Sequence, residues 1–179
     1  LITTSCTNKQ GNAATENSKT MEAQALPNPP DMDLHTAVFL ADLKAIQQHI
    51  KAGSDLNIKD AIGGSTPLIT ATVFGKTEIA KVLIEAGAEV NSTNNDGSTA
   101  LHTAAFLCRT EIVDLLLDNG TDKQIINNFG STALESVSAP FDEVKAIYDQ
   151  FSKDLGPLGL KLDYEQIEVT RPKIAEKLK

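Results

Sequence analysis

The chain of 179 residues lacks tryptophan altogether and has only six phenylalanines and two tyrosines, so large aromatic anchors are few. Its two cysteines and three histidines show no C-x-x-C or H-E-x-x-H spacing, so we expect no metal site. No G-x-S-x-G element, P-loop or Cys/His pairing occurs, and no run of about eighteen apolar residues could form a membrane-spanning helix. These absences argue against an enzyme and predict that the chain needs no cofactor.

Positive charge is also in short supply. Sixteen Lys and Arg stand against twenty-four Asp and Glu, which gives a formal net charge of −8. Such a chain repels the phosphates of nucleic acids and of anionic lipids, so we expect neither as a partner. The hydrophobic fraction of 41% is enough for one core, and the length fits one globular unit with extensions.

Residues 1–30 are rich in Thr, Asn, Ser, Ala and Pro and have few large apolar side chains. Burial of so little apolar surface cannot offset the entropy of ordering the segment, so a flexible N-terminal tail is expected. Three prolines between positions 27 and 30 mark its end. Asp31 is expected to cap the first helix, with Asp33 in the first turn.

The opening residues LITTSC resemble the end of a bacterial lipoprotein signal, in which small residues precede an acylated cysteine. The resemblance implies a lipid on Cys6, a polar tether up to residue 30, and a place on the periplasmic side of a bacterial cell envelope. Membrane contact would then occur only through this anchor. The alternative is a cytoplasmic protein in which Cys6 is a free thiol.

The middle of the chain repeats itself. GSTPLITA begins at Gly64, GSTALHTA at Gly97 and GSTALESV at Gly130, each 33 residues after the last, and LHTA at Leu34 is an earlier copy. The later half of the unit recurs as well, in KTEIAKVLI from Lys76 and RTEIVDLLL after it. Three blocks in one register over about four units indicate a repeat architecture.

Local chemistry explains each unit. Thr66 before Pro67 favours a helix start, and Gly75 favours a left-handed stop. A second helix with apolar residues on one face follows and ends at Gly87. Neither short helix can bury its apolar face alone, so neighbouring units must stack into an all-α solenoid of helix-turn-helix units.

These residues closely resemble the ankyrin repeat, and residues 96–122 carry most of the pattern D-G-x-T-P-L-H-x-A-A-x-x-G-x-x-E-I-V-x-L-L-L-x-x-G-A-D. The resemblance implies antiparallel helix pairs with projecting hairpin loops, in four units over 31–60, 61–93, 94–126 and 127–152. Residues 153–179 are expected to form a C-terminal cap, although a partner-binding arm is an alternative. Asp163 and Thr170 are expected to cap helices there, with Pro172 in the first turn of a last short helix.

Three polar or reactive side chains fall on repeat positions. The resemblance gives His35 and His102 a structural role in hydrogen bonds of the hairpin loops. His49 is expected to be a half-exposed capping residue, and Cys108, at the helix-ending glycine position, a packed and inert thiol.

The resemblance implies a non-enzymatic, monomeric module that binds another protein in its concave groove and on its loops. Alternatives are an inhibitor or immunity-type protein of an envelope or secreted enzyme, and a periplasmic protective protein. The residue pairs before the helix-ending position should face the groove, and the complete pairs are all apolar: Phe39, Leu40, Val73, Phe74, Phe106 and Leu107, with Ala139-Pro140 as the divergent fourth pair. The rim should be formed by Ile62, Asn95, Asp96, Ile126 and Phe129. The alternative is that the apolar pairs lean inward or lie beneath the N-terminal tail.

Overall fold

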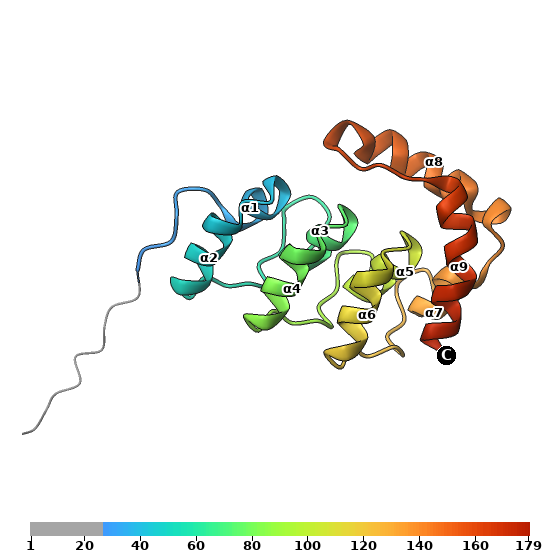
Figure 1. Cartoon of the computed structure of the whole chain (residues 1–179), viewed down its shortest axis with the longest axis horizontal. Coiled ribbons are helices and arrows are strands. Elements are labelled where there is room, and N and C mark those ends of the chain that lie inside the picture. The colour runs from blue at the N-terminus through green and yellow to red at the C-terminus, as the bar shows by residue number, and fades with distance from the viewer. Residues whose placement is uncertain (1–26) are drawn as a thin grey trace, which may run out of the picture.

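The computed structural model describes residues 27–179, which form α-helices and one short 3-10 helix. In chain order these are α1 (Leu34–Leu40), α2 (Leu43–Lys51), α3 (Pro67–Val73), α4 (Thr77–Glu85), α5 (Ala100–Phe106), α6 (Thr110–Asp118), α7 (Ala133–Ser138), α8 (Phe141–Leu155), η1 (Gly156–Leu158) and α9 (Tyr164–Leu178). Extended pairing in the described part is limited to one bridge between Thr93 and Thr99. The predicted helix-turn-helix solenoid is confirmed (Figure 1).

Residues 1–26, and Cys6 with them, lie outside the described residues. The flexible tail and the lipid anchor therefore stay predictions. Between residue 27 and the C-terminus, no helix combines the length and the apolar character that crossing a membrane requires.

The helix starts follow from the predicted threonines. The hydroxyls of Thr66, Thr99 and Thr132 each accept a hydrogen bond from the backbone amide three residues later, which satisfies a donor that the helix leaves free. At the first helix the prediction was wrong by two residues. Asp33, not Asp31, is the N-cap, and its Oδ1 accepts from Thr36 N at 2.9 Å.

The turn within each of the first three units has a left-handed residue at the same repeat position. Gly75 has φ +62°, and Ala41 and Cys108 take the same conformation with φ +57° and +55°. This residue reverses the chain, so the second helix packs back against the first, as α2, α4 and α6 do. Ala and Cys are rarely left-handed, and here the repeat stack holds them in that conformation.

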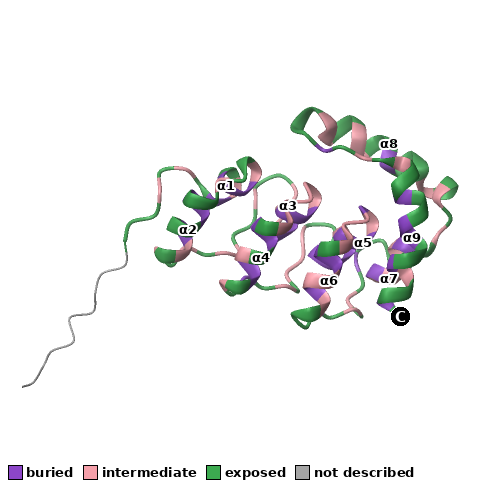
Figure 2. Ribbon diagram, in the orientation of Figure 1, coloured by how far each residue is buried: buried purple, intermediate pink, exposed green. Residues whose placement is uncertain are grey.

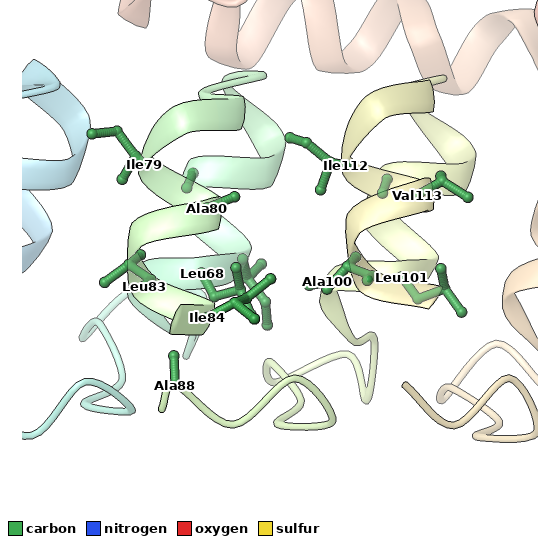
Figure 3. Close-up of a cluster of buried hydrophobic side chains, with 14 of the residues drawn as sticks. Leu68, Ile79, Ala80, Leu83, Ile84, Ala88, Ala100, Leu101, Ile112 and Val113 are labelled. Carbon is green, nitrogen blue, oxygen red and sulfur yellow. The ribbon is translucent and has the colours of Figure 1, made fainter. Parts of the chain in front are cut away.

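The core runs through the stack as one cluster. The inner helices α1, α3, α5 and α7 pack in succession, and α4 packs against α6. Residues 33 apart occupy equivalent places, as Ile79 and Ile112 do, and each faces the preceding unit (Figure 3). Figure 2 shows the buried residues along the interior of these stacks, with exposed residues outside. The spacing of the repeat therefore fixes the spacing of the core.

Polar side chains shape the hairpin loops in the same periodic way. The Oδ1 atom of Asp60, Asn94 and Asn127 accepts two backbone amide hydrogen bonds within its own loop. Neighbouring loops are joined because Asn95 N donates to Gly63 O at 2.9 Å. Gly64 combines φ +65° with an approach to the Asn95 side chain that leaves no room for a Cβ.

The fourth unit departs from the repeat. Ala139 and Pro140 are extended, with ψ of 146° and 145°, where the other units turn back in a left-handed conformation. A residue before proline avoids helical geometry, so the chain leaves α7 in a new direction. As a result, α8 stands off from α7, and α9 packs against α7 in its place (Figure 1). The expected boundary at residue 152 falls inside α8.

The C-terminal extension is one continuous helix after a short loop. Asp163 is its N-cap, as predicted, and its carboxylate accepts from Gln166 N. The second predicted cap was wrong, because Thr170 and Pro172 lie inside α9 and no shorter helix begins there. Ile174 and Leu178 are buried against the core of α7, so this helix covers the end of the solenoid.

Candidate functional site

The six predicted groove residues form one stripe at the C-terminal ends of α1, α3 and α5. We call this set the stripe. Phe39 and Phe74 meet edge to face, with ring centroids 5.2 Å apart, and both are half-buried. Leu40, the residue that follows Phe39, is 59% exposed. These three residues are the open half of the stripe: Phe39, Leu40 and Phe74.

Residues of α8 and α9 contact the other half of the stripe, which corrects the groove prediction for Leu107, whereas Val73 and Phe106 are half-buried, as Phe39 and Phe74 are. Leu107 is only 2% exposed and belongs to a second apolar cluster with Tyr148 of α8 and Ile167 of α9. The Phe106 ring stacks on Tyr148, with centroids 4.4 Å apart and planes 9° apart. Val73 is half-buried against the same cluster. In unit three the pair is covered by α8 and α9, which neither the groove prediction nor its alternatives named.

Tyr148 and Arg171 hold α8 in this place, and sequence reasoning did not single them out. The Tyr148 hydroxyl donates to the carbonyl of Phe106, and it accepts from Arg171 Nη1 at 2.7 Å. Arg171, 2% exposed, also donates from Nη2 to Ala139 O at 2.8 Å, which joins the end of α7 to α8 and α9. Burial raises the pKa of Tyr148 to about 12, with the nearby guanidinium acting in the opposite direction.

A sequence signal for this cluster exists in the spacing of the aromatic residues. Phe141, Tyr148 and Phe151 are seven and three residues apart, which places them on one face of a helix. This row of aromatic side chains predicts an apolar contact for α8, but it does not identify the residues that α8 contacts. The contact surface is supplied by Phe106, 42 residues away from Tyr148.

The predicted rim residues all lie on the loops and are exposed. Ile62 is 96% exposed and Phe129 is 75% exposed, and Ile126, Asn95 and Asp96 are also on the surface. The loop backbone is held by the hydrogen bonds that join neighbouring loops, such as that from Asn128 N to Asp96 O at 2.8 Å. The loops therefore present apolar side chains on a fixed frame, separate from the stripe.

The histidines serve the structure. His102 Nδ1 contacts Thr99 Oγ1 at 2.9 Å, and its Nε2 contacts the carbonyl of Ser131 in the next loop at 3.0 Å. His35 Nε2 bonds in the same way to Ile58 O, at 2.9 Å. The expectation for His49 was wrong. Its ring is buried between Met32 O and Ser54 Oγ, where it joins the start of the described chain to α2.

The burial of His102 makes the stability of the fold depend on pH. Burial lowers the pKa of His102 below its ordinary 6.5, and the carbonyls of Ser131 and Ile125 oppose this effect only in part. Between the folded and unfolded pKa values the unfolded chain binds the proton more readily, so stability falls as the pH drops below about 6.5. We expect His102→Gln to flatten the dependence of the free energy of unfolding on pH in this window, measured by urea unfolding. An unchanged slope would contradict this assignment.

Among residues 27–179, the one cysteine is Cys108, which follows Leu107 of the stripe. Burial raises the pKa of the Cys108 thiol to about 11, despite the charges of Arg171 and Arg109, so this thiol stays protonated and inert as predicted. Over residues 27–179, no group of three or more His, Cys, Asp or Glu is placed to hold a metal ion.

Known proteins share the repeat region. Human DNA-binding protein RFXANK is 32% identical over 82 residues, which is 45% of this chain and 32% of the relative. Human protein phosphatase 1 regulatory subunit 27 is 39% identical over 63 residues, 35% of this chain and 40% of the relative. Protein PhlB of Serratia liquefaciens is 36% identical over 56 residues, 31% of this chain and 25% of the relative.

The fold has solved counterparts as well. The crystal structure of the ankyrin repeat domain of Bcl-3 matches with a TM-score of 0.56 and 30% identity, covering 57% of this chain and 45% of that one. The chain spans less than half the length of each of these proteins. The family model for ankyrin repeats (3 copies) matches residues 34–134, more than half of the chain, in the units whose helices and loops are described above. The chain therefore belongs to the ankyrin repeat family.

Proposed function

We propose that this protein is a non-enzymatic binding module that holds a partner protein on the open half of the stripe. Ankyrin repeat proteins bind other proteins, and one relative is by name a regulatory subunit of protein phosphatase 1. The observation that carries the proposal is the exposure of Leu40, which directly follows Phe39 of the Phe39–Phe74 ring pair in the chain. A single exposed leucine is ordinary, but a leucine beside two half-open phenylalanines is an apolar patch of the kind that marks contact sites.

The rim of the site is proposed to include Ile62, Asn95 and Asp96, on loops that the Asn95–Gly63 hydrogen bond holds in place. A partner that reached Phe129 or Ile126 as well would have to span the loops of several units. The net charge of −8 supports a protein partner over a nucleic acid. RFXANK is by name a DNA-binding protein. Because this chain is negatively charged, we do not propose DNA binding for it.

Leu40→Glu together with Phe74→Glu is expected to abolish capture of the native partner, because a carboxylate placed in the centre of an apolar interface is left unpaired. Both side chains are at least partly exposed, so the melting temperature should stay within a few degrees of the native value. Capture by the tagged protein in its native host, followed by quantitative mass spectrometry, makes the measurement.

Val169→Glu is the matched control, because Val169 is a similarly exposed apolar residue on α9 away from the stripe. It should capture the partner as the native protein does. Phe106 is unsuitable for this test because its ring is packed under Tyr148. If the double variant stays folded and still captures the same partner, the binding surface lies on the loops or the opposite face, and the proposal fails.

A further inference from the structure

Units one and three of the solenoid carry the same two residues at the same repeat position. Phe39-Leu40 corresponds to Phe106-Leu107, and in both units the next residue is a non-glycine in the left-handed conformation. The local backbone and the side chains therefore match. The exposure of the leucine differs between the two units: Leu40 is 59% exposed and Leu107 is 2% exposed.

The difference is that unit three already has an occupant. Tyr148 of α8 stacks flat on the Phe106 ring, its hydroxyl donates to the Phe106 carbonyl, and Phe151 adds a second ring 5.7 Å from Phe106. Ile167 of α9 completes the cover over Leu107. The chain thus shows one way in which a Phe-Leu pair in this fold is bound. A helix stacks one aromatic ring on the phenylalanine and donates a hydrogen bond to the backbone carbonyl of that phenylalanine.

We infer that Phe39-Leu40 is a second site of this kind and receives an amphipathic helix of the partner protein, with a tyrosine stacked on Phe39. This inference rests on the proposed function and names the element that the open half of the stripe binds. Unit two cannot offer the same stack, because Val73 stands where units one and three have phenylalanine. Phe74 instead meets the Phe39 ring in a T-shaped contact.

The site in unit one and the site in unit three differ in the charged residues near them. Unit three has Arg109 directly after the left-handed residue, and α8, which lies over this unit, carries four carboxylates and two lysines. Unit one has Asp42 at the position of Arg109. The Asp42 carboxylate also accepts from Ala45 N, and unit two has Lys76 at this position. The preference for a helix with basic residues around its tyrosine therefore rests on the net charge of −8 of the whole chain.

The probe is a peptide derived from α8, with acetylated and amidated ends, that carries Asp142→Lys, Glu143→Lys, Asp149→Lys and Asp154→Lys. It is titrated into the intact isotope-labelled protein and followed by backbone amide chemical shifts. An isolated helix of this length is marginal in water, so weak but saturable binding is expected. The shifts should centre on Phe39, Leu40, Ala41 and Phe74, and the same peptide with Tyr148→Ala should bind about tenfold more weakly.

Matched protein variants locate the contact. Leu40→Glu should abolish the saturable shifts, whereas Val169→Glu should leave them unchanged. Absence of saturable shifts overturns the inference. So do shifts that centre on Phe106 and Tyr148, which would mean that the peptide displaces α8, and shifts that centre on the loop residues Ile62 and Phe129.

The outcome for the helix and the outcome for the proposed function can be told apart. If capture of the native partner depends on Leu40 while the peptide does not bind, the partner uses another kind of element and only the helix inference fails. If the peptide binds at Phe39 and Leu40 while native capture ignores the Leu40→Glu change, the proposed function fails.

Discussion

Ile174→Asp is expected to lower the free energy of unfolding by about 4 kcal/mol, because it removes a fully buried apolar side chain and places a carboxylate in an apolar cluster. Ile174 lies on the face of α9 that covers α7, in the same cluster as Val137. A solenoid of few units depends on its end caps, since the last unit otherwise exposes its core to water. Urea unfolding followed by circular dichroism measures the loss.

Lys173→Asp is the control for this prediction, because Lys173 is the exposed neighbour on the same helix. It should change stability by less than about 0.5 kcal/mol. Deletion of residues 157–179 should have a larger effect than Ile174→Asp and promote aggregation, because it uncovers apolar surface on α7 and on Leu107. A melting temperature that is unchanged by the deletion would show that the extension is an arm and not a cap.

The second large effect is expected at Arg171. Arg171→Met keeps much of the apolar stem but removes the donors to the Tyr148 hydroxyl and to the Ala139 carbonyl. Hydrogen bonds from a charged donor contribute about 1.5–3 kcal/mol each, and the buried carbonyl is left without this partner. Relief from burying the guanidinium offsets part of this loss, so we expect a net destabilisation of about 3 kcal/mol.

The loss of stability caused by Arg171→Met should be greatest in α8. Amide hydrogen exchange should speed up in α8, from Phe141 to Leu155, while α3 to α6 keep their protection, because α8 is held to the stack through Tyr148 and Arg171. Lys173→Met, which removes an exposed cation from α9, should leave this exchange unchanged. Uniformly faster exchange in α3 to α6 would contradict the role of Arg171 as the link that holds α8.

The stripe shows how far the repeat register can be used to predict a site. The register gives Leu40 and Leu107 the same repeat position, yet Leu40 is exposed and Leu107 is buried. Leu107 is buried because helices that follow the repeats return over it. The repeat register predicts the contacts between neighbouring units. It does not predict contacts made by a segment from outside the repeats.

The sequence by itself determined the helix pairs, their starts at Thr66, Thr99 and Thr132, and the period of the core, because each depends on chemistry within a few residues or on one repeat length. Only the tertiary structure decided the C-terminal end. The extended Ala139-Pro140 link, the packing of α9 against α7 and the Tyr148–Arg171 contact settle the place of α8. Those contacts join residues 23 to 42 positions apart, so no local pattern encodes them, and they decide which half of the stripe stays open.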